Sequence, residues 1–390
     1  MINRIKKAVE YLLYSKKELN KPKKVPILIF DEVGSELFLN YFKKEDTEII
    51  HIRKEKINLY VLIKTIFSLK VSGLEYISQY IKCVEPRIVI TFIDNNTNFY
   101  HLKTKSPNPK YIVVQNSIRD GEDPSYPINK AQVESRNFFV DYAFCYNKEV
   151  ASRYSSSSKC ESLIIGSFKN NIIGKLENEL PNINRLTFVS QYRNTPDIFA
   201  VLEGKAIYRK NFYEPDRIMV KKLQSFCIAN NLEFAIAGTT SSEKGNEFKF
   251  FESALGDSSW IFLPKKDIFS SYYEVFNSQY VVCLESTLAY EALSRGKRVG
   301  FFPCRKKYID VKNGRNFDAA FDKKGEFWTD EITDNEFEKV MNFVVNSNDV
   351  IWNSTVDKYK DDLIAYEPGN TKFIDLMKEL EVPIKDKFND

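Results

Sequence analysis

The chain has 390 residues, with 57 basic and 53 acidic side chains and a formal net charge of +4. This length favours two domains over one. The near balance of charge argues against a dedicated nucleic-acid binder, which would carry a strong basic bias. Only two histidines are present, and this excludes a metal site or a catalytic centre built from several histidines.

The six cysteines are scattered, with no CxxC pair. They predict free thiols in a reducing compartment, and neither a disulfide framework nor a zinc site. No apolar run reaches the ~20 residues that span a bilayer. Arg4, Lys6 and Lys7 interrupt any signal-peptide core. The sequence therefore predicts a cytoplasmic protein.

Residues 2–19 predict an amphipathic helix with Ile2, Ile5 and Val9 on one face and lysines around it. One interpretation is a helix that packs on its own domain with a solvated basic side. The other is peripheral contact with the anionic surface of the inner membrane. The first is favoured because such patterns are common in soluble proteins.

From residue 25 onward, predicted strands and helices alternate. The first series predicts strands at 25–30, 48–52, 87–93, 111–114, 139–145 and 163–165, and helices at 32–42, 59–69 and 74–81. The second predicts strands at 186–189, 233–237, 260–263, 280–284 and 298–302, and helices at 215–230, 336–345, 356–365 and 372–380. This rhythm predicts two α/β domains with mostly parallel sheets, residues 1–170 and 186–390, joined by a hinge at 171–185.

The most informative stretch is 281–302, which predicts a buried strand, a polar turn, a helix ended by Gly296 and a second strand. The turn is Glu285-Ser286-Thr287, and either hydroxyl residue is a good N-cap. Free N–H groups at a helix start beyond a strand end form an anion site. Glu291 lies one turn further, where its carboxylate would accept hydrogen bonds from sugar hydroxyls. This pattern fits the nucleotide-sugar half of a two-domain glycosyltransferase.

Ligands of parallel α/β sheets bind at the carboxyl ends of the strands. In the second domain the donor candidates that follow predicted strands are Ser190, Gln191, Arg193 and Lys265. Hydroxyl, amide and cationic groups at these positions suit a phosphate or a sugar carboxylate. The alternative for Arg193 and Lys265 is an ordinary solvated loop.

In the first domain, Asp94 follows a strongly apolar strand and is the first choice of catalytic carboxylate. It would act as a general base towards an acceptor hydroxyl or as a nucleophile. Asp31 and Glu32 are the reserve candidates. The predicted acceptor-binding residues are Asn95, Asn96, Gln115, Asn116 and Arg119. The alternative is structural, since Asp and Asn also favour turns and N-caps.

The sequence contains no Walker A, GxGxxG, GxSxG or HExxH motif. Kinase, dehydrogenase, hydrolase and zinc-protease functions lose most of their support. No DxD-type metal motif follows a predicted strand. A metal-independent transferase is the simplest interpretation.

Several short motifs occur in order: Ile93-Asp94-Asn95-Asn96, Gln115-Asn116, Ile165-Gly166-Ser167, Ser190-Gln191-Tyr192-Arg193, Ser286-Thr287-Leu288 and Phe327-Trp328-Thr329. Together, over residues 25–328, they resemble the bacterial surface-carbohydrate biosynthesis proteins described from spirochaetes. The resemblance implies a GT-B-like glycosyltransferase. It also implies a distant similarity to transferases that use CMP-activated ulosonic acids, such as Kdo and the nonulosonic acids, for capsule or O-antigen.

Several CMP-sugar transferases carry a His-Pro pair that contacts the donor phosphate. Here His51 precedes Ile52 and His101 precedes Leu102, and a UDP- or GDP-sugar donor therefore stays open.

The expected fold is thus α/β and GT-B-like, with two Rossmann-like, doubly wound domains facing a central cleft and with C-terminal helices. The C-terminal domain would bind a nucleotide sugar, with a CMP-sugar favoured and no cofactor or metal. The N-terminal domain would bind a glycan or lipid-linked glycan acceptor. Two alternatives remain: a nucleotide-sugar epimerase of the same architecture, and a non-catalytic glycan-binding or assembly protein.

Overall fold

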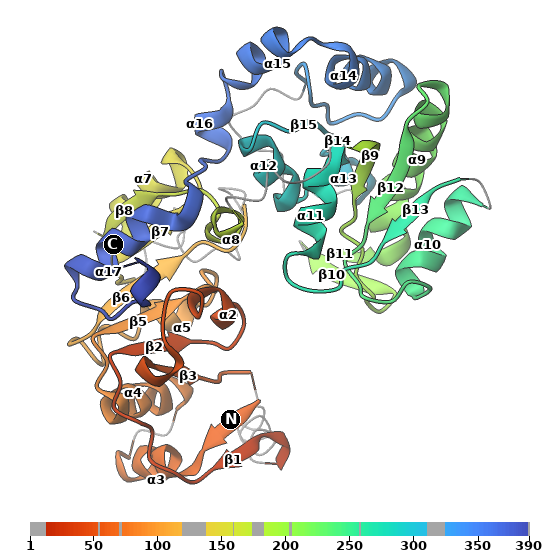
Figure 1. Ribbon diagram of the computed structural model, residues 1–390. Helices are drawn as coiled ribbons and strands as arrows, with labels where there is room; N and C mark the ends of the chain where they lie inside the picture. Colours follow the sequence, from red (N-terminus) through yellow and green to blue (C-terminus); the bar gives the residue numbers. More distant parts are fainter. Residues whose placement is uncertain are drawn as a thin grey trace. The chain divides into compact units, whose positions relative to one another are not determined.

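The computed structural model describes residues 13–53, 55–69, 72–118, 138–158, 160–173, 183–202, 205–256, 259–309 and 324–388. The chain divides into two compact units. Unit 1 comprises Met1–Ser117, Pro124–Asn171 and Gly369–Asp390, and unit 2 comprises Ile118–Asp123 and Ile172–Pro368. Each unit is built on one parallel sheet with helices packed against it (Figure 1).

The sheet of unit 1 has the strand order β3-β2-β5-β6-β7-β8, and every neighbouring pair is parallel. Its strands are β2 (Ile27–Phe30), β3 (Thr47–Ile50), β5 (Ile88–Thr91), β6 (Lys110–Val114), β7 (Tyr142–Cys145) and β8 (Glu161–Ile164). Strands β2 and β5 are buried along their whole length, as parallel strands covered on both faces are. The order reverses between β2 and β5, which makes their carboxyl ends the topological switch point of unit 1.

The helices of unit 1 are α2 (Ser35–Phe38), α3 (Leu59–Phe67), α4 (Gly73–Val84), α5 (Thr97–Tyr100), α7 (Lys148–Ser158), α8 (Phe168–Ile172) and α17 (Thr371–Glu379). A separate pair of short parallel strands, β1 (Lys16–Glu18) and β4 (Lys56–Asn58), precedes α3. The side chain of Asn58 caps α3 by accepting a hydrogen bond from the Val61 N–H at 3.0 Å.

The C-terminal helix α17 belongs to unit 1. Phe373 packs its ring against Phe38, Tyr41 and Phe168. The buried Asn370, with φ of 56°, donates to the Phe168 carbonyl and to the Tyr41 hydroxyl, both at 2.9 Å. The predicted C-terminal domain of 186–390 is therefore wrong for residues 369–390. Helical periodicity shows that α17 has an apolar face but does not show which core receives it.

The sheet of unit 2 has the order β13-β12-β9-β14-β15, again all parallel. Its strands are β9 (Ile183–Val189), β12 (Glu233–Ala237), β13 (Ile261–Leu263), β14 (Ser278–Cys283) and β15 (Arg298–Phe301). In sequence order this is 3-2-1-4-5, the Rossmann arrangement, with its switch point between β9 and β14. The expected fold class of two Rossmann-like α/β domains is confirmed.

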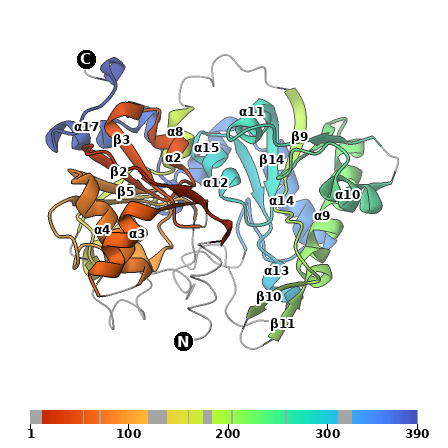
Figure 2. The same cartoon turned by 90° about the horizontal axis from the view of Figure 1, so that it is seen from below.

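The helices of unit 2 are α9 (Arg209–Ala229), α10 (Asn246–Leu255), α11 (Ser270–Asn277), α12 (Thr287–Ser294), α13 (Arg305–Ile309), α14 (Asp334–Asn346), α15 (Asp349–Val356) and α16 (Lys360–Leu363). An antiparallel hairpin of β10 (Ile198–Leu202) and β11 (Lys205–Tyr208) stands apart from the main sheet (Figure 2). The hairpin, α7, α10 and α11 were not predicted.

Four predicted elements need correction. The single helix expected over 356–365 is divided, since α15 ends at Val356, residues 357–359 form a turn and α16 covers Lys360–Leu363. The helix expected over 2–19 does not continue to its end, because residues 16–18 form β1; residues 1–12 lie outside the described residues. The helix expected over 32–42 is reduced to α2, since Gly34 before it has φ of 82°. The expected hinge at 171–185 overlaps two regular elements: residues 171 and 172 end α8, and residues 183–185 begin β9. Residues 174–182 lie outside the described residues.

All six cysteines are buried free thiols, as predicted. Burial raises the pKa of Cys283 and of Cys304 to about 12, which keeps both thiols protonated and unreactive at neutral pH. Among the described residues, no helix is both long enough and apolar enough to cross a bilayer.

Candidate functional site

Two polar side chains meet at the carboxyl edge of the sheet of unit 1. Glu32 lies just beyond β2 and His51 directly follows β3, and these strands pair with Phe30 opposite Ile50. His51 Nδ1 lies 3.0 Å from Glu32 Oε2. The His51 side chain is 10% exposed and that of Glu32 is 51% exposed. A carboxylate at one ring nitrogen orients an imidazole and stabilises its protonated form, which leaves Nε2 as the atom that exchanges a proton.

Asp31 and Arg53 lie beside this pair. The Asp31 side chain is fully buried, and its Oδ2 accepts from Arg53 Nε at 2.7 Å. Its Oδ1 accepts from the Val33 N–H at 3.2 Å. Asp31 has φ of 85°, a conformation that costs a non-glycine residue energy. The ion pair with the half-exposed Arg53 holds this strained turn in place and leaves a guanidinium group near the His51–Glu32 pair.

The loops after β2 and β5 touch at Gly34. A Cβ atom there would lie 2.5 Å from Phe92 Cδ1, closer than any real contact. The Thr91 hydroxyl also donates to the Phe30 carbonyl at 3.0 Å. Only glycine therefore allows the two loops at the switch point of unit 1 to approach each other this closely.

The structure places Asp94, the first choice of catalytic carboxylate, in the interior. Its side chain is buried, and its backbone carbonyl accepts from the Tyr100 hydroxyl at 2.6 Å. Burial, and next the charge of Asp94, raise the pKa of Tyr100 well above its usual value. In this arrangement an acceptor hydroxyl does not reach the Asp94 carboxylate. Its role as general base remains a prediction.

The predicted acceptor residues separate into structural and accessible groups. Gln115 is buried; its Oε1 accepts from the Tyr146 N–H at 2.8 Å and its Nε2 donates to the Ser117 carbonyl at 3.0 Å. Asn96 caps α5 by accepting from the Asn98 N–H at 3.1 Å. Asn95 is exposed and Asn116 is partly exposed. Arg119 lies outside the described residues.

In unit 2, the switch point brings together residues that follow β9, β14 and β15. Gln191 Nε2 donates to the Glu285 carbonyl at 2.9 Å, and Gln191 Oε1 accepts from Arg305 Nη1 at 2.9 Å. Arg305 Nη2 donates to both oxygens of Asp216, at 2.7 and 2.8 Å. Gln191 is thus held in one orientation between β14 and a buried ion pair.

Arg305 and Asp216 are both almost fully buried. Burial alone would lower the pKa of Arg305, but the carboxylates of Asp216 and Glu285 outweigh it and raise that pKa. Burial raises the pKa of Asp216, and the guanidinium of Arg305 opposes this rise. Arg305 was not among the residues predicted for this site. The only local signal for Arg305 was its position shortly after an apolar strand. Its partner Asp216 belongs to α9, far away in the sequence, so the ion pair could not be predicted from local patterns.

Ser190 and Glu247 form the centre of a second network. Ser190 Oγ donates to Glu247 Oε1 at 2.6 Å. The fully buried Glu247 also accepts from the N–H groups of Thr239 and Thr240, at 2.9 and 3.0 Å, and from the Thr240 hydroxyl at 2.8 Å. The Ser190 hydroxyl therefore donates its hydrogen bond to another protein side chain. Through Glu247, this network links the loops that follow β9 and β12. Contact between Ser190 and a donor remains a prediction.

Helix α12 has the predicted ends. Ser286 is its N-cap residue, and its side chain makes no capping hydrogen bond. At the other end Gly296 has φ of 84°, the Gly296 N–H bonds the Leu293 carbonyl at 2.9 Å, and the Lys297 N–H bonds the Ala292 carbonyl at 3.1 Å. These two bonds form a Schellman motif.

The other donor candidates differ in exposure. Glu291 is 3% exposed and Ser286 is 8% exposed. Thr287 is partly exposed, and Arg193 and Lys265 are exposed. The burial of Glu291 argues against the expected contact with sugar hydroxyls, because such a contact requires an accessible carboxylate.

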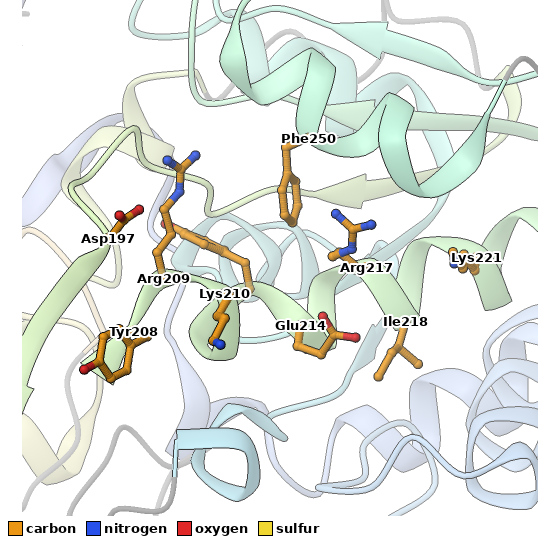
Figure 3. Close-up of a pocket in the computed structure, with 10 residues that line it drawn as sticks. Asp197, Tyr208, Arg209, Lys210, Glu214, Arg217, Ile218, Lys221 and Phe250 are labelled. Carbon is orange, nitrogen blue, oxygen red and sulfur yellow. The ribbon is translucent and has the colours of Figure 1, made fainter. Parts of the chain in front are cut away.

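A groove of about 860 Å³ runs along α9 in unit 2. Its lining residues are Asp197, Tyr208, Arg209, Lys210, Tyr213, Glu214, Arg217, Ile218, Lys221 and Phe250. Figure 3 shows the basic side chains projecting from α9 and Phe250 reaching in from α10. Arg209 lies 4.9 Å from the ring centre of Tyr192 and Arg217 lies 5.6 Å from that of Phe250. The excess of cations suits an anionic ligand.

Within the described ranges, no three or more His, Cys, Asp or Glu side chains gather as a metal site would require. Metal independence remains a prediction.

Comparison with known proteins defines the family. A family model described as O-antigen biosynthesis protein matches residues 112–381. No curated protein matches the chain. The fold is similar to that of an H548A variant of the wall teichoic acid polymerase TagF, with a TM-score of 0.52, 13% identity and coverage of 98% of each chain. It is also similar to a Listeria monocytogenes protein assigned as a UDP-N-acetylglucosamine 2-epimerase, with a TM-score of 0.53, 14% identity and coverage of 92% of this chain and 97% of that chain.

Identities this low show a shared fold, which is GT-B-like with two Rossmann-like domains. The family match covers more than half of the sequence. The chain belongs to the O-antigen biosynthesis protein family and is a GT-B-like protein of surface-carbohydrate biosynthesis.

Proposed function

We propose that the protein is a glycosyltransferase that moves a sugar from a nucleotide donor to a glycan or lipid-linked glycan acceptor during surface polysaccharide synthesis. The observation that carries the proposal is the 3.0 Å contact between His51 Nδ1 and Glu32 Oε2 at the carboxyl edge of the sheet of unit 1. An oriented imidazole at this edge is suited to remove a proton from an acceptor hydroxyl.

The proposed reaction is a direct displacement at the anomeric carbon. His51 Nε2 takes the proton of the acceptor hydroxyl as its oxygen attacks that carbon. The bond between the anomeric carbon and the phosphate oxygen breaks, and the nucleotide leaves with the electron pair. Glu32 stabilises the imidazolium ion, and no metal or cofactor takes part.

Two buried carboxylates are the competing candidates for the base. Asp94 and Asp31 are both 0% exposed, whereas the side chain of the proposed base His51 is 10% exposed and that of its partner Glu32 is 51% exposed. The two Asp31 oxygens are also occupied, by hydrogen bonds from Arg53 Nε and from the Val33 N–H. Exposure supports the His51–Glu32 pair over either aspartate.

In the proposal the donor binds at the switch point of unit 2, where Gln191 is fixed and Thr287 begins α12. Arg193 and Lys265 are exposed cations on the loops after β9 and β13 and would contact the phosphate or the sugar carboxylate. A CMP-activated ulosonic acid is the favoured donor because it carries both groups and because of the family resemblance. A UDP- or GDP-sugar is the alternative.

The first experiment is a thermal-shift screen with CMP, CDP, UMP, UDP, GDP and their sugar conjugates. A ligand that binds only the folded state stabilises it by about 2.7 kcal/mol at a hundredfold excess over its dissociation constant. The donor found in this way is then incubated with lipid-linked glycan, and the products are separated. A new glycosidic bond supports the proposal. An isomerised nucleotide sugar would replace it with an epimerase, and no product with any donor would favour a glycan-binding protein.

A further inference from the structure

Helix α3 of unit 1 exposes an unusually apolar face. Ile63 is 54% exposed, Ile66 52%, Phe67 80% and, just past the helix end, Leu69 is 91% exposed. Ile63, Ile66 and Phe67 are spaced i, i+3, i+4 and therefore share one side of the helix. Single exposed apolar residues are ordinary, but a contiguous group marks an interaction surface. These four residues form the α3 face.

The other side of α3 is firmly attached to unit 1. Val61 and Thr65 are buried, and the Thr65 hydroxyl donates to the Val61 carbonyl at 2.8 Å. Asn58 caps the helix start. Figure 1 places α3 at the lower edge of unit 1, and both views show it beside α4 (Figures 1 and 2). The α3 face is thus the outward side of a packed helix.

Lysines and further apolar residues accompany this face. Lys64 is exposed within α3, and Lys16 and Lys17 are exposed on β1, which pairs with the strand that leads into α3. Next to them Leu13 is 64% exposed, Tyr14 77% and Leu19 75%. The only acidic residue in segments 13–20 and 59–69 is Glu18, and it is paired with Lys56 at 3.1 Å.

We propose that the α3 face docks this protein on an anionic lipid bilayer. The aromatic and branched apolar side chains enter the boundary between headgroups and acyl chains, and the lysines contact the anionic headgroups. Charge favours a bilayer over a second copy of the chain. A two-fold contact through the α3 face would bring Lys64 of one copy close to Lys64 of the other inside an apolar interface.

The same surface is connected to the candidate site. Arg53, which bonds Asp31, is separated by two residues from β4, and β4 leads directly into α3. Docking through α3 would therefore hold at the membrane the same unit that carries His51 and Glu32. A lipid-linked acceptor in that membrane would then meet the unit that carries His51. This last step rests on the proposed function, whereas docking itself does not.

The test is co-flotation of the full chain with vesicles of phosphatidylcholine alone and with added phosphatidylglycerol. We expect binding to the anionic vesicles and at least about tenfold weaker binding for the double variant F67S/L69S, because two apolar side chains no longer enter the bilayer. Lys64→Glu should weaken binding to anionic vesicles only. The matched control V350S/I351S, on exposed residues of α15 in unit 2, should bind as the wild type does.

Three outcomes would overturn the docking proposal: no flotation of the wild type, equal flotation of F67S/L69S, or an equal loss in V350S/I351S. Conversion of a wild-type dimer to a monomer by F67S/L69S, without any change in flotation, would instead assign the α3 face to subunit contact. Nucleotide binding by F67S/L69S, measured by thermal shift, should match the wild type. Failure of docking is thereby distinguished from failure of the proposed function.

Discussion

His51 Nδ1 lies 3.0 Å from Glu32 Oε2 at the ends of two neighbouring parallel strands. If this pair supplies the base, His51→Asn should lower the transfer rate by about 10²–10⁴-fold, the usual contribution of general-base catalysis. Glu32→Gln should have a smaller effect, because glutamine still bonds the ring but does not stabilise the imidazolium ion. Transfer of labelled sugar to the acceptor measures both effects.

Glu36→Gln, at an exposed position of α2, is the matched control for these variants and should retain full activity. Asp94→Asn separates the two candidate bases. The assignment of His51 is contradicted if His51→Asn keeps normal activity while Asp94→Asn loses all activity but still folds and binds nucleotide. Asp94 would then be the general base.

Gly34→Ala should destabilise unit 1 by about 2–4 kcal/mol, since it combines a left-handed backbone with a clash. Gly34 has φ of 82°, and its Cβ would lie 2.5 Å from Phe92 Cδ1. The measurement is the free energy of unfolding in denaturant. Gly73→Ala is the control: no atom lies within 4 Å of its added Cβ, and its effect should be neutral or slightly stabilising. Equal stability of the two variants would contradict the steric argument.

Glu247→Gln should destabilise unit 2 by about 1–3 kcal/mol, because an amide nitrogen would face N–H and O–H donors that now bond a carboxylate. Those donors come from Ser190, Thr239 and Thr240. The free energy of unfolding is compared with that of Glu252→Gln, an exposed glutamate on the same helix, which should change little. A Glu247→Gln variant as stable as this control would show that the network contributes little.

Arg305→Met should lower the free energy of unfolding by about 3–5 kcal/mol, because it leaves the buried Asp216 carboxylate without its cation. The double variant with Asp216→Asn should recover part of that loss, and the cycle gives the coupling energy. Gln191 also loses its Arg305 contact at 2.9 Å, and thermal shift should therefore show weaker nucleotide binding in both variants. Unchanged nucleotide binding would show that Gln191 does not contribute to donor recognition.

The raised pKa of Tyr76 predicts that the folded state loses stability at alkaline pH. Burial raises its pKa from 10.0 to about 12, although its hydrogen bond with the Asn58 N–H opposes the rise. The folded state then favours the neutral phenol, so this stabilisation is complete below about pH 10 and is lost as pH rises to about 12. At about 1.4 kcal/mol per pKa unit, the stability difference between wild type and Tyr76→Phe should shrink by about 2 kcal/mol across that interval. Denaturant unfolding at several pH values measures it, and a constant difference would refute the assignment.

Much of the architecture was predictable because its signals are local. The apolar runs of β2 and β14 and the strand at 233–237 identify buried parallel strands. Ser286 and Gly296 mark the two ends of α12 within a few residues of each other. Such patterns depend on contacts between residues that are close in sequence, and the order of strands and helices follows from them.

The accessibility of each polar residue could not be predicted in this way. Asp94, Glu32 and Glu291 all follow apolar strands or lie close to one, yet Asp94 and Glu291 are buried and Glu32 is exposed. Burial depends on how the following loop packs against neighbouring loops, as Gly34 and Phe92 do. A single strand end does not contain that information.

The two parallel α/β sheets, the buried thiols and the ends of α12 follow from local sequence patterns, because periodicity and capping act over a few residues. Three other features depend on the three-dimensional fold: His51 contacts Glu32, Arg305 contacts Asp216, and α17 packs in unit 1. Each of these contacts joins segments far apart in sequence. Their proximity follows from strand order and loop packing, which are set by the fold of each whole unit.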